Sequence, residues 1–423
     1  MSPFKPQRSD GHHRRTAPAW QAAAALLVAA ALALGVVACG GGGGGGGGGG
    51  VEVVATPAAA VTPTAFTLGT ITGFGSIMVN GVRFDDSTAT VTDDAGTART
   101  AQSLHLGMRV EVDHANVDTS AGTARAAAVR YGSLVLGPVA AVDSAANSLT
   151  VLGQVVDVTT STVFSDSLSA GLSAVATGAV IEVHGLADAA TGHISATRVE
   201  AAASATSYKL RGTVAGLDAA AKTFNIGATA ISYAGLASSA VPTGLANGMA
   251  LRVQLATARS AGFWVAQSLG AKGGQPADHG NGQSGHVRGK ISAFTSASQF
   301  TVDGVVVDAS HASFPDGSAG LALGVEVEVE GTVSNSVLVA SQVSLESRHQ
   351  ADDSHKWQLF GAISALDAAT KTFVVRDVTV SYGSATRYVG GTLADLVLGR
   401  KVHVTGAVGS TRSQLQAAVV SFE

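Results

Sequence analysis

The segment Gly324-Val325-Glu326-Val327-Glu328-Val329-Glu330-Gly331 is the most informative stretch of this 423-residue chain for its fold. Valine and glutamate alternate with a period of two, which is the spacing of a β-strand that buries one face and leaves the other polar. Beyond residue 66, no segment holds apolar residues at the spacing of 3.6 that an amphipathic helix requires. The sequence therefore predicts an all-β fold.

The same kind of segment occurs five times. Each copy opens with a glycine two residues before Val or Ile, and a second glycine precedes an alternating segment. The first glycines are Gly69, Gly137, Gly212, Gly289 and Gly361, and the second glycines are Gly107, Gly178, Gly248, Gly324 and Gly399. The two glycines of a copy lie 35 to 41 residues apart. A spacing that is kept five times is typical of a tandem repeat.

A turn motif lies between the two glycines. Leu217–Phe224 closely matches Leu366–Phe373, and Val142–Leu149 is a looser version. An Asp that opens a run of small residues before an apolar residue is typical of a hairpin connection. We therefore predict a tandem array of five small antiparallel OB-like β-barrel units, because closure removes exposed strand edges. An open two-sheet sandwich is the alternative.

The markers divide the chain. We place the β units at residues 67–131, 132–203, 207–272, 287–347 and 357–423. Two hydrophilic stretches, residues 273–286 and 348–356, are interpreted as linkers. Units of this size bury little surface alone, so neighbouring units are expected to pack against each other.

The first 38 residues are typical of an export signal. Four basic residues precede the apolar run Ala22–Val37, and Val36-Val37-Ala38-Cys39 follows the pattern of a lipobox. This resemblance to lipoprotein precursors implies cleavage before Cys39 and lipidation of Cys39. The alternative is an uncleaved anchor, although the apolar run is shorter than the ~20 residues that span a bilayer. Gly40–Gly50 and the Ala/Thr/Pro-rich segment after it predict a flexible tether over residues 39–66.

The lipobox predicts a protein anchored in the outer membrane, on its periplasmic or cell-surface side, or otherwise on the outer face of the cytoplasmic membrane. Without residues 1–38 the chain has 22 basic and 29 acidic residues, a net charge of −7. A negative chain repels phosphate backbones, so nucleic acid is not expected as a partner. Cys39 is the only cysteine, which excludes an intrachain disulfide.

The sequence offers little chemistry. Glu326 and Glu328 lie on one strand face about 7 Å apart by strand rise, near the carboxylate separation of inverting glycosidases. Arg109 and Lys401 stand at the position of Glu326 in other copies, which is typical of surface. There is no nucleophile elbow and no metalloprotease motif. We predict no catalytic, cofactor-binding or metal-binding residues, and therefore a protein that is not an enzyme.

Histidine and tryptophan are the remaining candidates. The linkers carry metal-ligand residue types, namely Asp278, His279, His286, His349, Asp352, Asp353 and His355. We interpret both linkers as solvated, because ordering flexible ligands costs entropy. Trp264 and Trp357 are expected to pack in cores or between units, and a carbohydrate-binding face is the alternative.

The segment Gly69–Phe84 resembles the start of the bacterial domain-of-unknown-function family numbered 5666, and Gly324–Gly331 is similar to its second motif. The third copy departs from the family at Arg252 and Gln254. The resemblance implies an exported lipoprotein with tandem domains and no established activity. We expect a non-enzymatic envelope protein that binds or scaffolds, with polysaccharide or an envelope protein as partner. The alternatives are a carbohydrate-processing envelope hydrolase and a purely structural spacer or adhesin.

Overall fold

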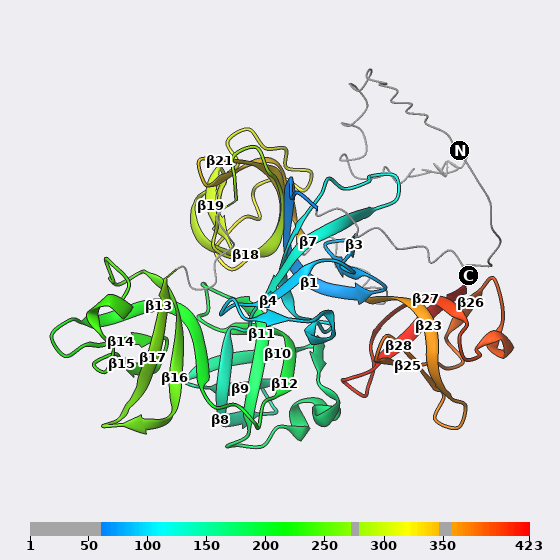
Figure 1. Cartoon of the computed structure of the whole chain (residues 1–423), viewed down its shortest axis with the longest axis horizontal. Coiled ribbons are helices and arrows are strands. Elements are labelled where there is room, and N and C mark those ends of the chain that lie inside the picture. Colours follow the sequence, from blue (N-terminus) through cyan, green and yellow to red (C-terminus); the bar gives the residue numbers. More distant parts are fainter. Residues whose placement is uncertain (1–60, 272–278, 347–356) are drawn as a thin grey trace, which may run out of the picture.

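The computed structural model describes residues 61–271, 279–346 and 357–423. Within these residues there is no α-helix, and the strands form five small closed barrels, numbered here in chain order (Figure 1). The prediction of an all-β tandem array of OB-like barrels is confirmed.

Every barrel has five main strands; barrel 1 adds two short strands, and barrel 5 adds one, between the third and the fourth main strands. Barrel 1 contains β1 (Ala65–Phe74), β2 (Ile77–Val79), β3 (Val82–Asp85), β4 (Thr90–Asp93), β5 (Ala98–Arg99), β6 (Arg109–His114) and β7 (Thr123–Tyr131). Barrel 2 contains β8 (Val135–Asp143), β9 (Ser148–Val151), β10 (Gln154–Phe164), β11 (Val180–Ala187) and β12 (Ile194–Ala201). Barrel 3 contains β13 (Tyr208–Asp218), β14 (Thr223–Ile226), β15 (Thr229–Ser232), β16 (Ala250–Ser260) and β17 (Phe263–Ala271).

The last two barrels follow the same plan. Barrel 4 contains β18 (Ser284–Ser296), β19 (Gln299–Val302), β20 (Val305–Asp308), β21 (Glu326–Ser334) and β22 (Val337–Leu345). Barrel 5 contains β23 (Trp357–Asp367), β24 (Thr372–Val375), β25 (Val378–Ser381), β26 (Arg387–Val389), β27 (Lys401–Val408) and β28 (Leu415–Phe422). Short 3₁₀ helices occupy the loops: η2 (Ala101–Ser103), η3 (Asp166–Leu168), η4 (Gly171–Ala174), η5 (Ser238–Ala240) and η8 (Leu393–Asp395).

One pairing scheme closes every barrel, and barrel 4 shows it in its simplest form. β18 pairs antiparallel with β19, and β19 with β20. β20 then lies parallel to β22, which pairs antiparallel with β21, and β21 returns to β18. This order is the path of an OB barrel. Because the first strand pairs on both sides in every barrel, the open sandwich is excluded.

The two marker glycines of each copy are explained by one hydrogen bond. The second glycine has a φ between +79° and +89° in all five barrels, a region that side chains disfavour. This left-handed turn aims its N–H at the carbonyl of the Val or Ile of the first marker, at 2.8 to 3.0 Å. The five acceptors are Ile71, Val139, Val214, Ile291 and Ile363. The markers therefore fasten the start of the fourth main strand to the first strand.

A second glycine requirement lies in the fourth main strand of three barrels. Gly185, Gly331 and Gly406 sit where the register between the fourth and fifth main strands shifts. A Cβ at any of them would come within 2.2 to 2.3 Å of a carbonyl oxygen of the neighbouring strand. Such a bulge bends the strand and helps a small barrel to close.

The predicted Asp turns are confirmed. Oδ1 of Asp218 accepts hydrogen bonds from the N–H groups of Ala220 and Ala221, both at 2.9 Å. Asp143 and Asp367 make the same contacts in barrels 2 and 5. These bonds satisfy the turn backbone and set the hairpin between the first and second strands.

The five barrels share three hydrophobic cores. Barrels 1 and 5 share one core, which includes Phe84 and Trp357, and barrels 2 and 3 share another. The core of barrel 4 includes Phe66 and Leu68 of β1. The barrels are therefore not independent, because a hydrophobic core is shared between barrels 1 and 5, between barrels 2 and 3, and between barrels 1 and 4.

Strand pairing between barrels explains the shared cores. β1 runs parallel to β18 from Ala65 to Leu68, and parallel to β23 at Gly73 and Phe74. β8 and β13 join barrels 2 and 3. Barrel 1 consequently lies at the centre of the molecule, with barrels 2, 4 and 5 around it and barrel 3 beyond barrel 2 (Figure 1).

Two expected boundaries need correction. β1 begins at Ala65, and both Ala65 and Phe66 are buried, so the end of the expected tether (39–66) is strand. β18 begins at Ser284, so the end of the expected linker (273–286) is strand as well. The physical reason is the pairing of these two ends with each other.

The expected signal (1–38), Cys39 and the linker 348–356 lie outside the described residues. None of the helices in the described part is long and apolar enough to cross a membrane.

Candidate functional site

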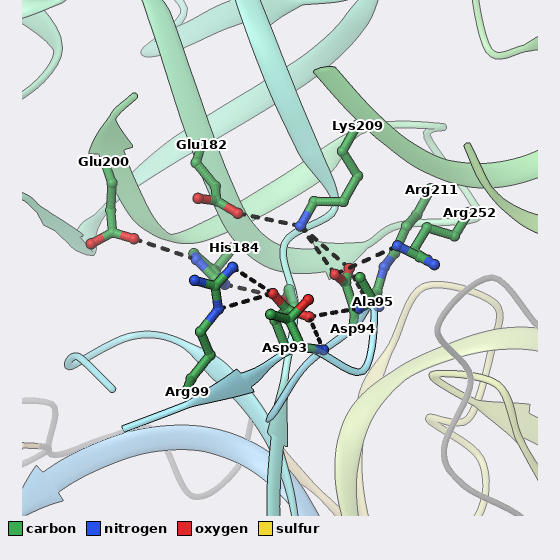
Figure 2. A network of polar contacts seen from close by, with 12 residues as sticks. Asp93, Asp94, Ala95, Arg99, Glu182, His184, Glu200, Lys209, Arg211 and Arg252 are labelled. Atoms are coloured by element: carbon green, nitrogen blue, oxygen red, sulfur yellow. Dashed lines mark hydrogen bonds and ion pairs between the residues drawn. The ribbon is translucent and has the colours of Figure 1, made fainter. Parts of the chain in front are cut away.

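A buried ion network joins barrels 1, 2 and 3 (Figure 2). The turn between β4 and β5 carries Asp94, whose side chain is 7% exposed. Its carboxylate accepts a 2.6 Å hydrogen bond from Arg211 and lies 3.3 Å from Nζ of Lys209 and 3.9 Å from Nη1 of Arg252. All three cations come from barrel 3. The charge of one aspartate in barrel 1 therefore binds barrel 3 to barrel 1.

The charge of Asp94 is stabilised by these neighbours. Burial by itself would raise the pKa of Asp94, but Lys209, Arg211 and Arg252 hold the pKa below its ordinary value. The carboxylate is therefore ionised at neutral pH. The network is a structural tie, because every strong charge in it already has an opposite partner.

Beside this tie lies a cluster of three metal-ligand residue types in barrel 2: Glu182 and His184 on β11, and Glu200 on β12. Glu182 faces Glu200 across the strand pair, so the three side chains share the outward face. Nδ1 of His184 lies 3.2 Å from the carbonyl of Gly132, and its Nε2 lies 3.5 Å from Glu200 (Figure 2). Burial opposes the charge of Glu200, but His184 and Arg198 hold its pKa far below the ordinary value.

Barrel 1 carries an equivalent cluster at the same repeat positions, four and six residues after the marker glycine. Glu111 and Asp113 lie on β6, and the third member is His279, which precedes β18. The His279 ring stacks on Phe66 with ring centroids 3.5 Å apart and planes 8° apart, and its side chain is 8% exposed. The expectation of a solvated linker is wrong at His279, because the ring finds an apolar face and two carboxylates.

A cavity of about 310 Å³ lies where barrels 1, 2 and 5 meet. Phe74 and Phe164 provide apolar surface, and the charged or titratable groups around it are Asp86, His105, Asp166, Arg198, Arg376 and Asp377. This volume is at the lower end of the roughly 300–1,000 Å³ of small-molecule sites. The mixture of donors, acceptors and two aromatic rings suits a small polar ligand.

Hydrogen bonds between barrels hold the cavity walls. Arg198 of barrel 2 donates to the carbonyl of Leu106 in barrel 1 at 3.1 Å, and Thr197 donates to that of Gly107 at 2.6 Å. Arg376 of barrel 5 donates to the carbonyl of Gly75 at 3.2 Å. Burial raises the pKa of Asp86 on the cavity wall, although Arg376 partly opposes this. The cavity is therefore formed before any ligand arrives.

The residues weighed from sequence lie elsewhere. Glu326 forms an ion pair with Arg288 at 3.1 Å, and Glu328 contacts His286 on β18. This pair of carboxylates lines no part of the cavity. Trp357 is 2% exposed in the core of barrels 1 and 5, and Trp264 packs against Tyr208 with centroids 5.6 Å apart. The default interpretation of both tryptophans as packing residues is confirmed.

Sequence reasoning missed the residues that the structure brings together. Asp94 and Arg211 are 117 residues apart, and no local motif links them. A usable signal was present in the repeats, since Glu-x-Asp and Glu-x-His occupy equivalent outward positions at Glu111–Asp113 and Glu182–His184. The partner His279 carried no signal, because contacts between repeats depend on how the barrels pack.

Comparison with known proteins identifies the family. Curated proteins give no match to the chain. Among solved structures, the one titled drosophila Unr CSD456 is 14% identical and is covered over 98% of its length, against 52% of this chain, with a TM-score of 0.13. The family described as domain of unknown function (DUF5666) matches four spans, residues 68–128, 137–200, 288–344 and 360–420, which leave out barrel 3. With barrels 1, 2, 4 and 5 all matched, the chain belongs to the DUF5666 family.

Proposed function

We propose that the protein is a membrane-anchored envelope lipoprotein that works by binding or scaffolding and is not an enzyme. The observation that carries the proposal is the cavity between barrels 1, 2 and 5, whose walls are held by hydrogen bonds between barrels. A preformed cavity with both polar and apolar walls suits recognition, since little order has to be created when a ligand binds.

The anchor rests on Cys39. The lipobox-like Val36-Val37-Ala38-Cys39 supports lipidation, and two or more acyl chains hold a protein stably at a membrane. The destination that fits is the outer membrane, on its periplasmic or cell-surface side, with the outer face of the cytoplasmic membrane as the alternative. The glycine-rich stretch after Cys39 would let the barrels stand away from the lipid surface.

A saccharide is the ligand class that the cavity favours. Sugar hydroxyls take hydrogen bonds from guanidinium groups and give them to carboxylates, and their C–H faces pack on aromatic rings. Arg198, Arg376, Asp166, Asp377 and Phe164 offer these groups around one hollow. Its size accommodates an end or a branch of a polysaccharide rather than a long chain.

The anchor is tested by fractionation of cells that express Cys39→Ala. The parent protein should sediment with membranes, and the variant should move to the soluble fraction of the same compartment. A variant that stays membrane-bound contradicts the lipid anchor and leaves the binding proposal to be judged by its own experiment.

Binding is tested with envelope polysaccharides on a glycan array, probed with the parent chain and with Asp377→Asn. Asn keeps the left-handed turn that Asp377 occupies and removes one charge from the cavity wall. Losing a hydrogen bond to a charged group costs about ten- to hundred-fold in affinity. Asp218→Asn, in an exposed turn of barrel 3, is the matched control and should bind like the parent.

Three results contradict parts of the proposal. If Asp377→Asn binds the glycan as well as the parent does, the glycan binds outside the cavity. Binding of envelope proteins but no glycan replaces the ligand class and favours the adhesin or scaffold. Release of reducing ends from a bound glycan makes the protein a hydrolase.

A further inference from the structure

A second site lies away from the cavity, where His279 covers the outward face of barrel 1. Glu111 and Asp113 alternate with the core residues Val110 and Val112 on β6, so both carboxylates point out of the barrel. Nε2 of His279 lies 3.5 Å from Oε1 of Glu111, and its Nδ1 lies 3.9 Å from Oδ1 of Asp113. An imidazole and two carboxylates thus meet with their lone-pair atoms facing one another.

Two of these atoms have no hydrogen-bond partner within the described residues. Oδ1 of Asp113 and Nε2 of His279 are both buried and unsatisfied. Leaving such a group unpaired costs about 1–3 kcal/mol, so a native structure normally provides a partner. A neutral imidazole carries only one N–H and cannot donate to both carboxylates.

Arg130 also holds both carboxylates. It faces Glu111 across β6 and β7 and donates to Oε1 of Glu111, the oxygen that also lies near His279, and it donates to Oδ2 of Asp113 at 2.8 Å. Its guanidinium orients both carboxylates, as outer-shell groups do around metal ligands. Oδ1 of Asp113 is left facing His279.

We propose that Glu111, Asp113 and His279 bind one divalent transition-metal ion of the Zn²⁺ or Mn²⁺ class. The three residues offer ligand atoms within 4.8 Å of one another. Zn²⁺ ligands at about 2.0–2.2 Å from the ion lie about 3.3–3.6 Å from each other in a tetrahedron. The 3.5 Å between Nε2 of His279 and Oε1 of Glu111 fits that geometry, and an adjustment of the Asp113 side chain would bring its carboxylate to the same ion. One imidazole with two carboxylates suits Zn²⁺ or Mn²⁺ better than Ca²⁺, which takes six to eight oxygens.

The two clusters differ in how their carboxylates are paired. Glu111 and Asp113 share one guanidinium, that of Arg130. The equivalent cluster in barrel 2 differs, because Glu182 is paired with Lys209 at 3.3 Å and Glu200 with Arg198 at 2.8 Å. The same residue types in that cluster are therefore a natural internal control.

A metal here would fasten the residues before β18 to β6. His279 lies between the strands of barrel 3 and those of barrel 4, and β18 pairs with β1 a few residues further along. The ion would act as a clip that keeps barrel 4 seated on barrel 1. This role is independent of the cavity and of the lipid anchor.

The test is equilibrium dialysis of the full chain, stripped with a chelator, against Zn²⁺, with Ca²⁺ in a parallel arm. The parent should bind Zn²⁺ and not Ca²⁺, and its thermal midpoint should rise with Zn²⁺. His279→Gln keeps the side-chain size and should lose this binding by more than the roughly 10- to 100-fold that an outer-shell change causes. Asp113→Asn, which is isosteric, should lose it as well.

His184→Gln is the matched control and should keep the parent's affinity. No Zn²⁺ binding by the parent overturns the proposal, and so does binding that both His279→Gln and Asp113→Asn retain. If His184→Gln loses Zn²⁺ binding and His279→Gln keeps it, the ion binds in barrel 2, and this result also overturns the proposal. Circular dichroism confirms that the variants are folded.

Discussion

Barrel 1 is joined to barrel 4 and to barrel 3 by two chemically opposite junctions. Toward barrel 4, β1 extends into the neighbour and buries Phe66, 1% exposed, in the core of barrel 4. Toward barrel 3, the turn after β4 places Asp94 among Lys209, Arg211 and Arg252. The junction with barrel 4 is mainly apolar and backbone-paired, with one ion pair between Arg109 and Asp303, and the junction with barrel 3 is held by charge.

The difference teaches how each junction should respond to conditions. Burial of an aromatic side chain depends on excluded water and is insensitive to pH or salt. A tie between one carboxylate and three cations depends on the ionisation of that carboxylate and on screening. The same molecule therefore contains one junction that depends mainly on apolar burial and one that acid and salt should weaken much more.

The largest effect is expected for Phe66→Ala. Removing a buried Phe side chain costs about 3–5 kcal/mol in the free energy of unfolding, here from the part that contains barrel 4. Denaturant unfolding monitored by hydrogen exchange of β18 and β21 measures it. Phe294→Ala in the same barrel is the control, since Phe294 is 38% exposed and should change stability by less than about 1 kcal/mol. Equal effects of the two variants would contradict the shared core.

Asp94→Asn should come second. Breaking a fully buried ion pair costs about 3–5 kcal/mol, and a loss of about 1–3 kcal/mol is expected here because the cations keep some contact with water. The change should raise hydrogen exchange in β13 and β16 of barrel 3 and leave β18 unaffected. A loss of protection in β18 instead would mean that the two junctions are coupled.

Low pH should weaken the junction with barrel 3 before the junction with barrel 4. The pKa of Asp94 is held below its ordinary value of 3.8, so its contribution is fully present above that value and is lost as pH falls through the lower folded pKa. Below pH 3.8 the contacts of barrel 3 should loosen first. Other carboxylates with lowered pKa values, including Glu200, titrate in the same window. The difference between the parent and Asp94→Asn isolates Asp94, and parallel acid profiles would contradict its role.

The smallest effect is expected for Arg99→Ala. Arg99 is paired with Asp93 beside the network, but its side chain is 46% exposed. Exposed pairs contribute about 0.2–1 kcal/mol, and 1 M salt should erase the difference because it shortens the screening length to about 3 Å. Thermal unfolding at low and high salt measures this. A loss as large as that of Asp94→Asn would place the main tie at Asp93.

The barrels were predictable and their neighbours were not. Alternation at Gly324–Gly331 and the paired glycines encode each barrel locally, because the second glycine must reach the first strand of its own copy. Phe66 follows an Ala/Thr/Pro-rich stretch and had no visible partner, since β18 comes much later in the chain. Asp94 was one of many surface-type acids until packing surrounded it with three cations. Bonds within a repeat leave the same residues in every copy and can be recognised in the sequence. A contact between two copies occurs once and leaves no such pattern.

The sharing of β1 has a consequence for biogenesis. A chain that emerges amino-terminus first presents the edge of β1 from Ala65 to Leu68, with Phe66 beside it, long before β18 exists to cover them. Until then the edge can accept a strand from another molecule. Truncation after barrel 3 would make that exposure permanent, so the shortened product should self-associate even though three complete barrels remain.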